Sequence, residues 1–107
     1  MTAFDDREKA FEKKFEREEE ARFKAASRAA HLFGLWVGEQ LGLKGAALEA
    51  YAREMIDMTV AKKERGSLIA RAEENLKAKG IVMTRHRLEH EMEDFYLDAQ
   101  RQASGKD

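Results

Sequence analysis

Residues 29–43 read AAHLFGLWVGEQLGL and form the most apolar stretch of a chain that is otherwise rich in charge. This stretch of 15 residues contains His31, Glu39 and Gln40, so it is too short and too polar to span a bilayer. Apolar residues instead recur at the spacing of one helix face: Phe23, Ala26, Ala30, Phe33, Val37 and Leu41, with Leu32 and Trp36 widening it. The sequence therefore predicts a core-facing helix and no membrane insertion.

The composition favours one small all-α domain. The 107 residues include no Pro and no Cys, and they are dominated by good helix formers such as Ala, Leu, Glu, Lys and Arg. The net charge of −1 comes from 20 basic and 21 acidic residues, so we expect no nucleic-acid partner. Without Cys there are no disulfides or thiolate metal sites, and the acidic start MTAFDDREK does not resemble a signal peptide. We therefore expect a cytoplasmic protein.

Glycines divide the chain into four predicted helices, because Gly takes the left-handed conformation just past a helix end. The breaks are expected at Gly42 with Gly45, at Gly66 and at Gly80. The first helix is expected to be very long, from a capping box at residues 2–5 to about Leu41. These breaks predict a four-helix bundle whose first helix is the longest.

The three later helices each carry an amphipathic pattern. For the second we expect Leu48, Tyr51, Ala52, Met55, Ile56 and Thr59 to face inward, with fraying through residues 61–65. For the third we expect Ser67 as N-cap and an inner face of Leu68, Ile69, Ala72 and Leu76. For the fourth we expect Thr84 as N-cap, a hydrophobic staple of Met83 and Leu88, and inward Leu88, Met92, Phe95, Tyr96 and Ala99. Residues 21–103 should therefore form the bundle, followed by a disordered tail at 104–107.

Two short motifs have a functional and a structural interpretation. Gly34, Gly38 and Gly42 form overlapping G-x-x-x-G steps, which we interpret as a close approach of another helix of the bundle, with a dimer interface as the alternative. We expect the free protein to be a monomer. The motif His86-Arg87-Leu88-Glu89-His90 matches the inverted zinc-protease signature. Since only 17 residues follow and no third ligand is evident, we expect no metal, no cofactor and no catalysis.

The N-terminal segment, residues 1–20, differs in kind from the rest of the first helix. It contains eight acidic and five basic residues, yet Phe4, Phe11 and Phe15 fall on one narrow stripe if the segment is helical. Acidic and basic residues also line up with like charges at i+4, which weakens an isolated helix. Burying two phenylalanines cannot offset the entropy of ordering about fifteen residues. We therefore expect a segment that is mobile or marginally helical when free, and that folds on a partner.

The same segment resembles a known family. FDDREKAFEKKFE at residues 4–16, followed by Glu19-Glu20-x-Arg22-Phe23-Lys24-Ala25 and then Leu35-Trp36 with Gly42, is closely similar to the alpha-proteobacterial F-type ATP synthase inhibitor, the zeta subunit. The specific likeness covers roughly residues 4–42. Beyond it, the chain length, the helix layout, residues 50–52 and residues 80–84 agree. Residues 16–20 depart from the family pattern by being more charged.

The resemblance implies a small four-helix protein that is not an enzyme. It implies that the N-terminal segment folds as a helix between the α and β subunits of F1, against the γ subunit, and blocks rotation in the ATP-hydrolysis direction at the cytoplasmic face of the bacterial inner membrane. The implied partner-binding residues are Phe4, Asp5, Asp6, Arg7, Glu8, Lys9, Phe11, Lys14 and Phe15. The alternative is a helical adaptor or assembly factor that binds another protein complex through the same segment.

Overall fold

The described residues fold into four helices, α1 (Ala3–Gln40), α2 (Gly45–Val60), α3 (Arg65–Ala78) and α4 (Arg85–Ala103). This computed structural model describes the backbone of residues 3–103 and the side chains of residues 18–102. The described residues include no strand, so the predicted all-α fold is confirmed. The predicted mobility of residues 1–20 stays a prediction, and the predicted tail at 104–107 lies outside the described residues.

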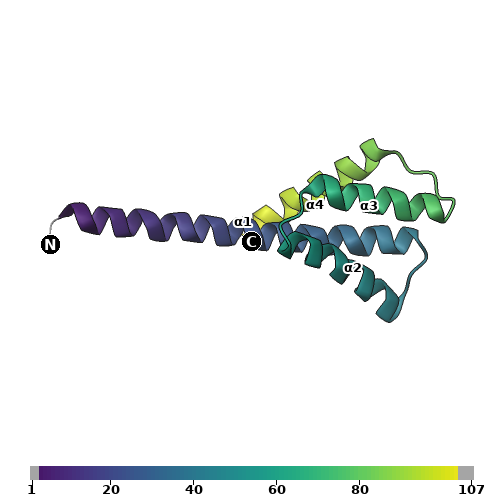
Figure 1. Ribbon diagram of the computed structural model, residues 1–107, viewed down its shortest axis with the longest axis horizontal. Coiled ribbons are helices and arrows are strands. Elements are labelled where there is room, and N and C mark those ends of the chain that lie inside the picture. The colour runs from purple at the N-terminus through teal and green to yellow at the C-terminus, as the bar shows by residue number, and fades with distance from the viewer. Residues whose placement is uncertain (1–2, 104–107) are drawn as a thin grey trace.

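The bundle is built around the C-terminal half of α1 (Figure 1). Helices α2 and α4 both pack along this half, whereas α3 packs mainly against α4. The core joins all four helices, and its largest fully buried side chains are Phe33, Val37, Met55, Leu76 and Leu88. The predicted four-helix bundle with a long first helix is therefore confirmed.

Two glycines of α1 allow α2 to approach closely. A Cβ atom added to Gly34 would lie 2.7 Å from Ala52 Cα, and one added to Gly38 would lie 2.5 Å from Leu48 Cδ1. This confirms that another helix of the bundle approaches α1 here. Gly42 has a different role, since it has φ +83° and open space around it.

The predicted core positions Ala30, Phe33, Val37 and Leu41 are buried, whereas Leu32 is half-buried outside both core clusters and Phe23 is exposed. Phe23 is 49% exposed and belongs to neither core cluster, while Ala25 and Ala29 are buried against Ala99 of α4. Helix α2 runs antiparallel to α1, with Leu48 against Gly38 and Ala52 against Gly34, and it ends at Val60, before it reaches Phe23. Phe23 is exposed because the helix that would cover it stops too early.

The ends of α1 and α3 confirm the predicted glycine stops. Gly42 and Gly80 have φ values of +83° and +74°. Leu43 N–H donates to Gly38 O at 2.9 Å, and Ile81 N–H donates to Leu76 O at 2.9 Å, as in the Schellman motif that closes many helices. Both glycines therefore occupy positions where a side chain would be strained.

The end of α2 corrects two predictions. The left-handed position belongs to Lys62, with φ +62°, and Gly66 lies inside the first turn of α3. Ser67 is likewise inside α3 and is not its N-cap, which is Glu64 without a side-chain capping bond. Lys63 N–H donates to Met58 O at 2.9 Å, so backbone bonds close this helix end without glycine.

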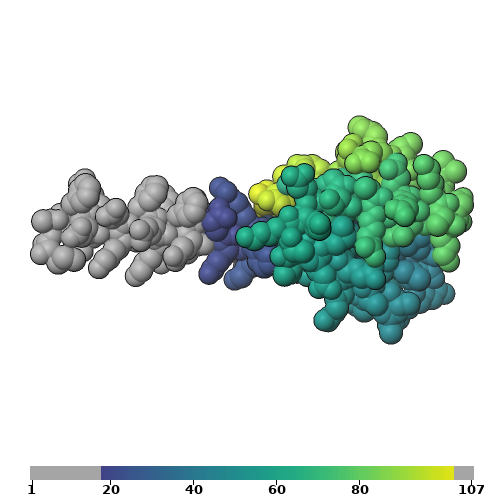
Figure 2. All heavy atoms as spheres, viewed as in Figure 1, coloured from purple at the N-terminus to yellow at the C-terminus, as the bar shows by residue number. Residues whose placement is uncertain are grey.

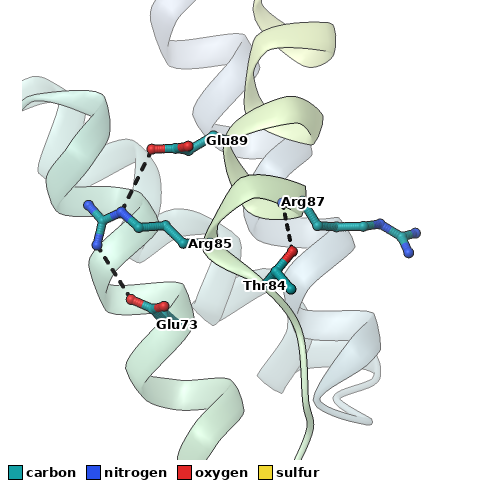
Figure 3. Close-up of polar contacts among 5 residues, drawn as sticks. All are labelled: Glu73, Thr84, Arg85, Arg87 and Glu89. Atoms are coloured by element: carbon teal, nitrogen blue, oxygen red, sulfur yellow. Dashed lines mark hydrogen bonds and ion pairs between the residues drawn. The ribbon is translucent and has the colours of Figure 1, made fainter.

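The start of α4 confirms the predicted cap. The backbone N–H of Arg87 donates to Thr84 Oγ1 at 3.1 Å (Figure 3). Leu88 is fully buried and Met83 packs against the same core cluster, as expected for a hydrophobic staple. Arg85 joins α4 to α3, with its Nη1 3.4 Å from Glu73 Oε1 and its Nε 3.7 Å from Glu89 Oε2. In the described part of the chain, no helix is long and apolar enough to cross a membrane.

Candidate functional site

Helix α1 leaves the bundle on the N-terminal side of Ala25. Ala25 is 2% exposed and is the first buried side chain among the described residues, packed with Ala29 and Ala99. Residues 18–20 and 22–24 are exposed. At 1.5 Å per residue, the backbone from Ala3 to this point spans about 33 Å of helix. Figure 1 shows this projecting part of α1 extending away from the bundle as one helix.

The predicted partner-binding residues all belong to this projecting part. Their backbone forms part of α1, but the side chains from Phe4 to Phe15 lie outside the described residues. The grouping of Phe4, Phe11 and Phe15 on one stripe therefore stays a prediction. The continuous helical backbone is the geometry that the prediction requires.

The described side chains nearest to the bundle on the projecting part are highly charged. Glu18, Glu19 and Glu20 are exposed, and Arg22 Nη1 lies 3.3 Å from Glu19 Oε1. Because both partners are exposed, such a pair contributes only about 0.2–1 kcal/mol. Lys24, one turn closer to the bundle, has no ion pair with a described residue. These charges keep this part of α1 solvated rather than packed on its own chain.

The end of the bundle from which α1 projects has its own surface, which we call the collar and define as Phe23, Val60, Lys62 and Lys63. Phe23 and Val60 are 49% and 56% exposed, and both lysines are exposed. The turn between α2 and α3 lies at this end, beside the C-terminal part of α4 (Figures 1 and 2). The collar and the C-terminal turn of α4, which packs on Ala25 through Ala99, are therefore the parts of the bundle nearest to the projecting helix.

Reasoning from sequence alone missed the collar. The apolar spacing placed Phe23 on the core face, and the sequence predicted only fraying at residues 61–65. The available signal was length: if α2 runs back along α1 from Gly45, its 16 residues cannot reach as far as Phe23.

The residues of the H-x-x-E-H motif do not form a site. His86, Glu89 and His90 are all exposed. Glu89 lies beside Arg85, and His90 Nδ1 lies 3.5 Å from Asp94 Oδ2 in the same helix. Among the side chains that the structure describes, no group of three or more His, Asp or Glu could hold a metal ion.

A groove with polar walls lies between α1 and α2. It is lined by His31 of α1 and by Glu49, Arg53, Ile56 and Asp57 of α2. His31 Nε2 lies 3.7 Å from Glu49 Oε2, and both side chains are substantially exposed. The groove is open to solvent and contains no arrangement of a nucleophile with a base.

Comparison with known proteins identifies a family. The family model described as ATPase inhibitor subunit zeta matches residues 1–102. No match is found among curated proteins or among solved structures. The matched region includes both the projecting part of α1 and nearly all of the bundle.

Proposed function

The chain belongs to the ATPase inhibitor subunit zeta family, and from this membership we propose that it binds the F1 part of ATP synthase and blocks its ATP hydrolysis. The family predicted from the sequence is thereby confirmed. An inhibitor subunit acts by binding, so membership also supports a role other than catalysis.

The projecting part of α1 is the inhibitory element in this proposal. The observation that carries it is that α1 continues as a helix well beyond Ala25, where the cover of the bundle ends. A single helix is about 10–12 Å across and can enter a groove between subunits. We propose that it enters F1 between an α and a β subunit, against γ, and prevents rotation in the hydrolysis direction.

The predicted contacts divide by chemistry. Phe11 and Phe15, with Phe4, are the apolar anchors, since aromatic side chains dominate the free energy of most interfaces. Asp5, Asp6, Arg7, Glu8, Lys9 and Lys14 are the polar contacts. The partner supplies the buried surface that the segment cannot find in its own chain.

The test is ATP hydrolysis by F1 from the same organism with three forms of the protein. The intact chain should inhibit, a form lacking residues 1–20 should not, and Phe11→Ala with Phe15→Ala should inhibit much more weakly. Val82→Ala is the matched control, because Val82 is 97% exposed in the loop between α3 and α4, at the opposite end of the bundle. Circular dichroism of each form checks that the bundle is intact.

Two results would overturn the proposal. One is an intact chain that leaves hydrolysis unchanged, and the other is equal inhibition by the intact and shortened forms. Capture of partners with the N-terminal segment as bait separates the alternative: recovery of a complex without α, β and γ subunits would indicate an adaptor or assembly factor.

A further inference from the structure

We propose that the collar is a second contact surface, which seats against the outer surface of F1 at the mouth of the groove that α1 enters. The proposal rests on the proposed function and adds to it. It assigns a binding role to Phe23, Val60, Lys62 and Lys63, outside the predicted inhibitory segment.

The first argument is the difference in width between the helix and the bundle. The two shorter dimensions of the molecule are 24 and 23 Å, whereas a single helix is about 10–12 Å across. A groove that accepts one helix therefore cannot admit the bundle. When α1 has entered to its full depth, the end of the bundle that surrounds α1 meets the partner first, and that end is formed by the collar together with the C-terminal turn of α4 (Figure 1).

The second argument is the apolar surface at this end. Among the described residues, four large hydrophobic side chains are exposed: Phe23, Val60, Val82 and Leu97. Two of the four belong to the collar. Neither Phe23 nor Val60 belongs to a core cluster, so neither side chain is part of the hydrophobic core of the bundle. An exposed aromatic side chain such as Phe23 is of the kind enriched in the cores of interfaces.

The third argument is charge. Lys62 and Lys63 are adjacent and exposed, and neither forms an ion pair with a described residue. The next basic residue, Arg65, is engaged: its Nη1 lies 2.8 Å from Glu93 Oε2, and its guanidinium lies 3.8 Å from the centre of the Tyr96 ring. The partner surface that fits the collar is therefore an apolar spot flanked by acidic side chains.

A small cavity places the turn between α2 and α3 beside α1, one helical turn from Phe23. Lys63 and Thr59 line a small cavity together with Ala26 of α1. Phe23 precedes Ala26 by three residues and so lies one turn away on the same side of α1. Val60 is the last residue of α2, and Lys62 lies in the turn between α2 and α3. The surface is thus continuous with the helix that the partner binds.

Thiol protection gives a direct test, because the chain contains no Cys. Single variants Lys62→Cys and Val82→Cys are reacted with a maleimide, free and in the presence of excess F1. We expect F1 to slow the reaction of the thiol at 62 about tenfold or more, as a buried interface position requires. The thiol at 82, at the other end of the bundle, should react at the same rate in both conditions. Equal rates at 62 with and without bound F1 would overturn the collar.

Binding measurements give an independent test. Phe23→Ala and the double variant Lys62→Glu with Lys63→Glu should each weaken the affinity for F1 about tenfold, with the charge variant also reducing the salt dependence of association. Val82→Ala should bind like the unmodified chain. If the unmodified chain does not bind F1, the proposed function fails together with the collar. If it binds and inhibits, and the collar variants bind equally well, only the collar fails.

Discussion

Gly34 of α1 lies directly against Ala52 of α2, with the position of a Gly34 Cβ only 2.7 Å from Ala52 Cα. Ala52 Cα is a backbone atom, so it cannot make room for a Cβ at position 34 without a shift of α2. At Gly38 the nearest atom is Leu48 Cδ1, the far end of a flexible and half-buried side chain. The two glycines of the same helix face therefore differ in how much a methyl group would cost.

Gly34→Ala should lower the free energy of unfolding by about 1–3 kcal/mol, the usual cost of overpacking, even though Ala favours a helix by up to about 1 kcal/mol. Gly38→Ala should cost less because Leu48 can change rotamer. Gly66→Ala is the matched control: it lies in α3 with nothing within 4 Å and should stabilise by about 0.5–1 kcal/mol. Urea unfolding measures all three. Equal stabilisation at 34 and 66 would contradict the close contact.

Thr84→Ala should lower the free energy of unfolding by about 1 kcal/mol, because the N–H of Arg87 would lose its acceptor at the start of α4. Thr84→Ser keeps an acceptor oxygen and should lose much less. Thermal unfolding followed by circular dichroism measures the difference. If the Ser and Ala variants were equally destabilised, the loss would come from the methyl group of Thr84 and not from the cap.

Lys62→Gly should raise the free energy of unfolding by up to about 1 kcal/mol, since a residue with a Cβ is strained at φ +62°. Lys62→Ala removes the same charge but keeps the Cβ, so it should give no such gain. Gly80→Ala, at φ +74° with open space around it, should be destabilising for the converse reason. Chemical unfolding of the four proteins under one condition tests the ordering.

The fold could be predicted from local patterns wherever a residue's own side chain, or its lack of one, determines the local structure. Thr84 caps α4 through its own side chain, and Gly42 and Gly80 end helices because they lack one. Phe33 and Val37 recur at helical spacing and are fully buried. In each case the cause acts within a few residues along the chain.

The predictions were wrong where the local structure depends on residues that are distant along the chain. Phe23 has the spacing of a core residue, but its burial depends on how far α2 runs along α1, which its own neighbours do not encode. Lys62 takes the left-handed position because backbone hydrogen bonds close α2, so Gly66 four residues later gave a false signal. The collar was missed for the same reason, since it joins α1 to a turn some forty residues away.

Tyr51 should make the stability of the bundle depend on pH at the alkaline end. Its Oη donates to Asn75 Oδ1 at 2.8 Å. Burial raises its pKa from 10.0 to about 12; the charge of Arg71 opposes this shift and the charge of Glu54 adds to it. The neutral phenol is thus favoured in the folded state. Its contribution to stability is complete below pH 10, and it is lost as the pH rises from 10 through about 12.

We therefore expect the difference in unfolding free energy between the unmodified chain and Tyr51→Phe to be constant up to pH 10. Above pH 10 the difference should shift in favour of Tyr51→Phe. Urea unfolding at pH 8, 9, 10 and 11 measures it. The absorbance of tyrosinate, taken as the difference between the two proteins, should give a midpoint near 12 for the folded chain and near 10 in urea. A folded midpoint near 10 would contradict the burial of Tyr51 against α3.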